Sequence, residues 1–304
     1  PGNDVNGGNN GRVGVFKYST PGKLGGNWEI MGNILGINIG SSTYSIYMGN
    51  TMQLDQSGKI IAIGSDDVVE TANIPSSMKV PYDSNDYTNV AITAVFQYRT
   101  VTESEFNAGN TTSFDPNDGT PIIQAHGGSW NENTEYWVQL GNYMYIPYNS
   151  SGDGTISISS DGSRVMISSS KYRPDDYTNS SEYHGATEVF EYSSPGEING
   201  TWNRLGARMF GVPTYGYGYR YTASMTQDGN VVALSHNDAD GISYATGNYG
   251  VVRAMEYRLV TQTEWDNAKK AATEDITTTI GVPLIYPDGD TVLNTTKKYW
   301  IQLG

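Results

Sequence analysis

A pattern of about fifteen residues recurs three times in the chain, and each copy has the form of a β-hairpin. The cleanest copy, residues 155–169 (TISISSDGSRVMISS), has alternating small, β-branched and apolar residues on both sides of Asp161-Gly162. The other copies are residues 51–65 and 222–236. Asp-Gly between two such runs is a strong hairpin signal, because a type I′ turn needs positive φ at both central residues. The pattern therefore predicts three antiparallel hairpins.

Two further strand motifs follow the hairpins in a fixed order. The first, as in ATEVFEY, is rich in β-branched and aromatic residues and ends in Tyr; the second, as in YWVQLG, carries a Trp and ends in Gly. Copies of the first are residues 12–18, 92–98, 186–192 and 251–257, and copies of the second are residues 27–32, 136–141, 201–206 and 299–304. Hairpin, Tyr strand and Trp strand together predict a four-stranded antiparallel unit.

The motifs define three complete units, 51–141, 155–206 and 222–304, and a half unit, 12–32, that lacks its hairpin. Short antiparallel sheets repeated radially form a β-propeller, whereas a β-solenoid needs a shorter and more even repeat. We therefore expect an all-β chain in which residues 1–304 form a single β-propeller or a section of one, with four-stranded blades. Closed propellers have about four to eight blades. The half blade favours a section of a longer array, with its missing hairpin supplied by downstream sequence or by a neighbouring copy.

The segments between the Tyr and Trp strands are of two kinds. The half unit and the second complete unit share the insert S-[TS]-P-G-x-[LI]-x-G-x-W, in residues 19–28 and 193–202. The other two units share R-x-V-T-x-[ST]-E-[FW], in residues 99–106 and 258–265. Thr and Glu three residues apart have the spacing of a helix capping box, so each of these two inserts is expected to begin a short helix.

Composition excludes several classes of function. A net charge of −14 with scattered basic residues argues against a nucleic-acid partner. The chain has no cysteine, which excludes disulfides and thiolate metal sites. No apolar stretch reaches the roughly 18 residues of a membrane span. His126, His184 and His236 lack metal-ligand spacing, and no nucleophile elbow or P-loop is present, so we expect no enzymatic activity.

The combined pattern S-x-S-x-D-G-x-x-V-A-[IL]-[GS], V-[FY]-x-Y and W-x-Q-L-G resembles a repeat found in large proteins of marine microalgae, marine bacteria and large algal viruses. It is distantly similar to the FG-GAP propeller of the integrin-α type, although no F-G…G-A-P signature is intact here. The resemblance covers residues 12–304. It implies a propeller fold and a surface, adhesion or structural role outside the cell, on a cell surface or on a virion.

The resemblance also implies cation-binding loops between strands. The candidate calcium ligands are Asp4, Asn6, Asp238 and Asp240, since calcium prefers several hard oxygen ligands and Asp and Asn around a Gly turn supply them. None of these loops has the complete D-x-[DN]-x-[DN]-G pattern. Ordinary Asx-rich turns are the alternative, and no other cofactor is expected.

Tyrosines recur in the segments that join one unit to the next. The candidate ligand-binding residues are Tyr143, Tyr145, Tyr148, Tyr215, Tyr217 and Tyr219. In a propeller these segments emerge on one face, where tyrosines would suit a glycan or a protein surface. The alternative is that the rings pack between blades. The repeated tryptophans are expected in the core or between blades, where truncation costs roughly 3 kcal/mol or more.

These features predict a non-enzymatic structural or adhesion module that presents Tyr-rich loops to a glycan or protein partner. Two alternatives stay open. One is a propeller-type carbohydrate-active enzyme, which would use a pair of carboxylates. The other is a purely structural assembly subunit that a neighbouring chain completes.

Overall fold

The computed structural model describes residues 11–35, 48–65, 69–70, 89–109, 123–124, 129–147, 154–170, 182–183, 185–197, 200–211, 214–215, 221–236, 251–270 and 283–304. These described residues are 49% strand and 7% helix, which confirms the all-β class. The strands form several antiparallel sheets, and the described residues contain no closed barrel or propeller. Within the same residues, no helix is long and apolar enough to cross a membrane.

Each complete unit forms one sheet in which the hairpin, the Tyr strand and the Trp strand lie side by side in the expected order. The first sheet has β3 (Met48–Leu54), β4 (Ile60–Ser65), β6 (Asn89–Thr100) and β8 (Glu135–Gln139). The second has β10 (Thr155–Ile158), β11 (Arg164–Ser169), β13 (Ala186–Tyr192) and β14 (Trp202–Arg204). The third has β17 (Tyr221–Met225), β18 (Val231–His236), β19 (Val251–Arg258) and β22 (Tyr299–Gln302). The half unit is the antiparallel pair β1 (Phe16–Tyr18) and β2 (Trp28–Ile30).

Short additional strands widen these sheets beyond four strands. In the first sheet, β5 (Val69–Glu70) and β9 (Met144–Pro147) pair with β6, and β7 (Ile123–Gln124) pairs with β8. In the second, β15 (Met209–Phe210) pairs with β13, while β12 (Glu182–Tyr183) and β16 (Thr214–Tyr215) form a separate pair. In the third, β21 (Leu284–Tyr286) pairs with β22 and, in parallel, with β20 (Lys269–Lys270).

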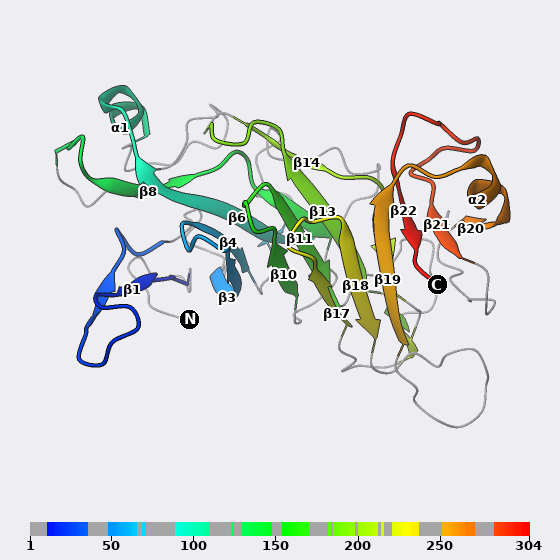
Figure 1. Ribbon diagram of the computed structural model, residues 1–304, viewed down its shortest axis with the longest axis horizontal. Helices are drawn as coiled ribbons and strands as arrows, with labels where there is room; N and C mark the ends of the chain where they lie inside the picture. The colour runs from blue at the N-terminus through cyan, green and yellow to red at the C-terminus, as the bar shows by residue number, and fades with distance from the viewer. Residues whose placement is uncertain are drawn as a thin grey trace.

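The sheets follow one another along the molecule (Figure 1), and three of the four hydrophobic clusters of the described residues lie between successive sheets, whereas the fourth lies between the third sheet and α2. One cluster joins the half unit to the first sheet, a second joins the first sheet to the second, and a third joins the second sheet to the third. In β4, Ile61 and Ile63 face the half unit, whereas Ile60 and Ala62 face the second sheet. A sheet in the middle of the array is therefore buried on both faces, so its strands are apolar at consecutive positions.

The three hairpins are present, but the expected type I′ turn is wrong. Among the described residues, Asp288 is the one non-glycine residue with positive φ, so Asp161 does not adopt the conformation that a type I′ turn needs. Gly162 has φ +71° and donates its N–H to the Ser159 carbonyl at 3.0 Å. This is the pattern of a type I turn followed by a glycine bulge, in which only the glycine needs positive φ.

The two short helices begin at the expected capping boxes. Helix α2 (Gln262–Asn267) has Thr261 as its N-cap: the Thr261 hydroxyl accepts from the Glu264 N–H at 3.2 Å, and the Thr261 N–H donates to Glu264 Oε2 at 2.8 Å. Helix α1 (Glu103–Gly109) repeats this arrangement with Thr102 and Glu105. An arginine from the end of the Tyr strand binds each glutamate, and the Arg258 Nη2 to Glu264 Oε1 distance is 2.6 Å.

The capping interactions of Glu264 make the free energy of unfolding depend on pH in the acid range. The hydrogen bond from Arg258, helped by the Thr261 N–H, lowers the pKa of Glu264 from 4.5 to about 2. A carboxylate with a lowered pKa stabilises the fold above its unfolded pKa, and the stabilisation is lost as pH falls toward the folded value. We expect Glu264→Gln to lower the free energy of unfolding at pH 7 by about 0.5–1 kcal/mol. This difference should shrink between pH 4.5 and pH 2 in urea titrations. Glu103→Gln, at an exposed carboxylate in the first turn of α1, is the control, and a pH-independent loss at Glu264 would contradict the prediction.

Candidate functional site: repeated joints between units

The half unit and the first two complete units each carry a bulge at the end of the Trp strand. In the first sheet, Phe96 pairs with Gln139 and Thr93 pairs with Met144. The chain therefore advances five residues from β8 to β9 while the partner strand β6 advances only three. The second sheet has the same mismatch between β13 and the segment that contains β14 and β15. The two extra residues make a β-bulge, which pushes the chain out of the sheet. We call this Leu-Gly or Met-Gly segment the L-G bulge; its three copies are Met31-Gly32, Leu140-Gly141 and Leu205-Gly206, and Leu303-Gly304 has the same sequence.

A tyrosine and a tryptophan form a ring pair beside the bulge of the preceding unit. The Tyr–Trp pairs are Tyr98–Trp137, Tyr192–Trp202 and Tyr257–Trp300, with ring centroids 5.1, 4.9 and 5.1 Å apart. The tyrosine ends the Tyr strand and the tryptophan lies opposite it on the Trp strand, as the pairing of Tyr98 with Trp137 shows. Such cross-strand aromatic pairs stabilise antiparallel sheets.

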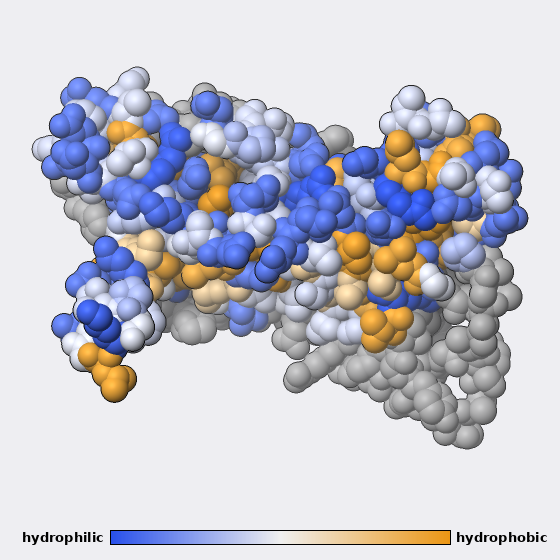
Figure 2. All heavy atoms as spheres, in the orientation of Figure 1, coloured by the Kyte–Doolittle hydropathy of each residue, from blue (hydrophilic) through white to orange (hydrophobic). Residues whose placement is uncertain are grey.

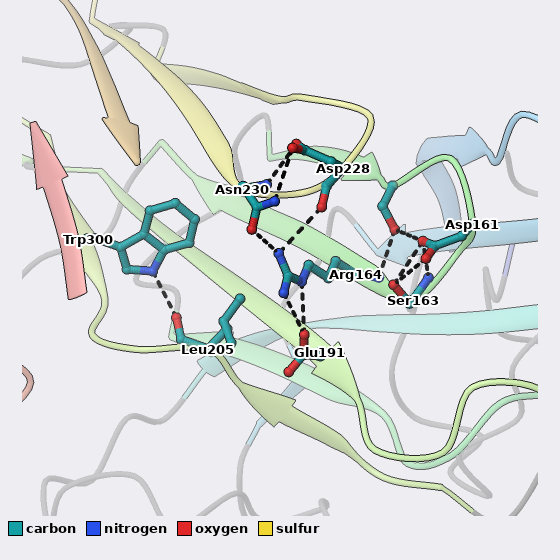
Figure 3. A network of polar contacts seen from close by, with 9 residues as sticks. Asp161, Ser163, Arg164, Glu191, Leu205, Asp228, Asn230 and Trp300 are labelled. Carbon is teal, nitrogen blue, oxygen red and sulfur yellow. Dashed lines mark hydrogen bonds and ion pairs between the residues drawn. The ribbon is translucent and has the colours of Figure 1, made fainter. Parts of the chain in front are cut away.

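Each of these tryptophans donates its indole N–H to the L-G bulge of the preceding unit. The acceptors are the carbonyl oxygens of Met31 for Trp137, of Leu140 for Trp202 and of Leu205 for Trp300, at 2.6, 2.8 and 2.8 Å (Figure 3 shows the last). The three tryptophans are buried, which confirms their expected place in the core and between units. A buried indole N–H without an acceptor is costly, so this bond couples neighbouring units.

The glycine of the bulge lies against the rings of the next unit. Gly32, Gly141 and Gly206 have φ of +64°, +61° and +71°, in the left-handed region that glycine adopts at low cost. A Cβ on Gly141 would lie 2.9 Å from the Tyr192 ring and 3.3 Å from the Trp202 ring. Only glycine fits both the backbone conformation and the space. We call the bulge, with the Tyr–Trp pair that it contacts, a joint.

A second repeated contact joins the hairpins. Gly162 packs against Ile60 of the preceding unit, and Gly229 packs against Arg164 at the equivalent position. Figure 3 shows how Arg164 crosses this boundary: its Nη1 donates to Asn230 Oδ1 at 2.6 Å, while its Nη2 binds Glu191 Oε1 at 2.7 Å within its own unit. The hairpins therefore stack in the same order as the joints.

The structure places two of the six candidate ligand-binding tyrosines in the core. Tyr143 is 0% exposed and Tyr145 is 3% exposed, and burial raises the pKa of both well above its ordinary value. They pack with Val13, Val15 and Leu35 of the half unit. These two tyrosines therefore pack between units, which was the alternative to ligand binding. The structure gives Tyr215 a backbone position in β16, paired with Glu182, while Tyr148, Tyr217 and Tyr219 lie outside the described residues.

The expected calcium ligands Asp4, Asn6, Asp238 and Asp240 also lie outside the described residues. Elsewhere, no three His, Asp or Glu side chains of the described residues come together as a metal site. Asp228, next to the hairpin residue Gly229, instead accepts hydrogen bonds from Thr226 and Asn230 within its own hairpin turn. Hydrogen bonds from Thr226 and Asn230 lower its pKa to about 2.

No protein-family model, no curated protein and no solved structure matches the chain. The geometry of the joints therefore carries the functional argument. Sequence reasoning missed the L-G bulge as a contact site, although one signal was available: each motif Trp is followed by Gly at the same spacing, in pairs such as Trp137 and Gly141.

The joint predicts a specific cost of filling the glycine position. Gly141→Ala should lower the free energy of unfolding by about 1–2 kcal/mol for the left-handed backbone, and by about 1–3 kcal/mol more for the clash with the Gly200 carbonyl and the two rings. Gly58 is the matched control, because its φ is +70° and a Cβ there would meet nothing within 4 Å. Urea or thermal unfolding measures both variants. Equal losses at Gly141 and Gly58 would show that the joint glycine is not packed as described.

Proposed function

We propose that this protein is a non-enzymatic structural and adhesion module, a section of a β-propeller-like array that acts at a cell or virion surface or elsewhere outside the cell. The single observation that carries the proposal is the threefold recurrence of one joint. The aromatic and glycine residues that recur most regularly along the chain contact the neighbouring unit in each of these joints. Repetition of this kind is what a scaffold needs, since each repeat must bury its surface against the next.

The propeller arrangement is supported by two features of the described residues. The strand order from hairpin to Trp strand is the same in all three complete units, as it is in propeller blades. The same joint also relates each unit to the next, and one repeated contact geometry rotates successive units in the same sense. A fan of blades is the outcome of such a rotation.

The adhesive surface in this proposal is the set of segments between units. Tyr148, Tyr217 and Tyr219 are the candidate contact residues in these segments, and tyrosine suits glycan or protein partners because it combines a flat apolar ring with a polar tip. Asp238 and Asp240 would supply calcium-ligating oxygens in the loop after the last hairpin. The net charge of −14 favours solubility and disfavours polyanions, which fits a protein exposed to solvent.

The adhesion proposal predicts loss of binding without loss of fold. Tyr217→Ala combined with Tyr219→Ala should weaken binding to an immobilised glycan panel by at least about tenfold, because aromatic anchors dominate such contacts. Leu24→Ala, which removes a fully exposed apolar side chain from the half-unit insert, is the control and should bind normally. Circular dichroism reports whether each variant is folded.

Two results would count against this proposal. Unchanged binding by the double tyrosine variant would remove the adhesive surface from these segments. Hydrolysis of a glycoside substrate that follows the protein through purification would favour the carbohydrate-active alternative.

A further inference from the structure

The chain contains Asn-x-Ser and Asn-x-Thr triplets, the acceptor pattern for N-linked glycans. They begin at Asn110, Asn149, Asn179, Asn199 and Asn294. A chain rich in Asn, Ser and Thr contains such triplets by chance, so the pattern alone identifies no site. Asn294-Thr295-Thr296 is the triplet that lies within the described residues, and its geometry can therefore be compared with what an acceptor needs.

Asn294 lies in an exposed turn between β21 and β22. All three residues of the triplet are exposed. The Lys297 N–H donates to the Asn294 carbonyl at 3.1 Å, which closes a β-turn over residues 294–297. In Figure 1 this connection, in red at the upper right, projects beyond β22 near α2, and the face in Figure 2 has the same orientation. An enzyme can therefore reach the turn without opening a sheet.

Thr296 binds the oxygen end of the Asn294 amide. Asn294 Oδ1 accepts from the Thr296 N–H at 3.0 Å and from Thr296 Oγ1 at 2.8 Å. A backbone N–H can only donate, so the oxygen lies against the turn and the nitrogen is the other end of the amide. Among the described residues, no group accepts a hydrogen bond from Asn294 Nδ2. The atom that a glycan modifies is therefore the free end of this side chain.

The turn is fixed to the core through its backbone rather than through the Asn294 amide nitrogen. The Asn294 N–H donates to the Tyr299 hydroxyl at 3.1 Å. Tyr299 is buried, and its ring lies 5.1 Å from the ring of Trp265 in α2. Lys297 Nζ also binds Asp290 Oδ2 at 3.0 Å. A sugar on Nδ2 would leave all of these contacts in place.

The first unit contains the same turn without an acceptor triplet. Residues 131–133 (NEN) occupy the equivalent place. Asn131 Oδ1 accepts from the Asn133 N–H at 2.8 Å, and the Asn131 N–H donates to the Tyr136 hydroxyl at 3.3 Å. Asn131 is exposed although the second sheet packs against the first, so exposure belongs to the place of the turn within a unit. Asn133 supplies no hydroxyl, which makes this turn a natural comparison.

We propose that Asn294 is an acceptor site for an N-linked glycan. The donor is an oligosaccharide carried on a lipid diphosphate, and an oligosaccharyltransferase catalyses the transfer. Asn294 Nδ2 forms a bond to the anomeric carbon and loses one proton to a base of the transferase. The bond from that carbon to the diphosphate oxygen breaks, and the lipid diphosphate leaves with its electron pair. The inference rests on the proposed place outside the cell, because N-linked glycans are added to secreted chains.

Peptide mass spectrometry of the 304-residue chain, secreted from eukaryotic cells behind a cleavable signal peptide, tests this site. Peptide-N-glycosidase in heavy-oxygen water converts each glycosylated Asn to labelled Asp. We expect label at Asn294 and none at Asn131. Thr296→Ala should abolish the label at Asn294, and Thr296→Ser should keep it.

Two further variants separate modification from folding. Asn294→Asp keeps an oxygen that can accept from Thr296 but has no amide nitrogen, so it should lose the glycan and melt at the temperature of the enzymatically deglycosylated parent. Asn133→Thr creates an acceptor triplet on the equivalent turn of the first unit. We expect it to add label at Asn131, because that turn has the same geometry.

An unlabelled Asn294 in the secreted chain overturns the proposal. Label at Asn294 that persists in Thr296→Ala overturns it as well, as does an Asn133→Thr chain in which Asn131 stays unlabelled, because the turn would then not be what presents the acceptor. The adhesion and scaffold functions are tested separately. The glycan-panel assay and the Gly141 and Gly58 variants can be measured in the Asn294→Asp background, where their results do not depend on this glycan.

Discussion

The hydrogen bond from Trp137, Trp202 and Trp300 to a carbonyl of the preceding unit is the interaction on which the rest of the structure depends. The indole is buried between two sheets, so its N–H must find an acceptor, and the acceptor belongs to a different unit. No unit can therefore complete its own core. The bulge, the left-handed glycine and the ring pair all serve to bring one carbonyl oxygen to one indole nitrogen.

All three hairpin turns contain the same hydroxyl-to-carboxylate hydrogen bond, although the two residue types stand in the opposite order in the first turn. Ser159 binds Asp161 at 2.6 Å in the second unit, and Thr226 binds Asp228 at 2.6 Å in the third. In the first unit the carboxylate stands at the earlier position, and Ser57 donates to Asp55 at 2.6 Å. Because hydroxyl and carboxylate form the same bond in either order, the first hairpin folds alike without an Asp-Gly pair.

Local patterns in the sequence were enough to predict the strand order, both capped helices and the burial of Trp137, Trp202 and Trp300, because β-branched runs and capping boxes act over a few residues. The L-G bulge was not predictable in this way. Its two key features, a backbone carbonyl that accepts the indole N–H and a glycine with positive φ, produce no periodic pattern of side chains in the sequence. For the same reason the sequence left open whether Tyr143 and Tyr145 bind a ligand or pack between units. The chain re-enters the sheet as β9 after the bulge, where Met144 and Ile146 face the second sheet and the two tyrosines face the half unit.

The chemistry of the joint also has an evolutionary consequence. From the preceding unit the tryptophan requires only a backbone carbonyl and a glycine, and a methionine at position 31 serves as well as a leucine at position 140. A unit therefore does not recognise which copy precedes it. Recombination can duplicate, delete or reorder such units without redesigning their contacts, so the length of the array can change faster than the sequence of its repeats.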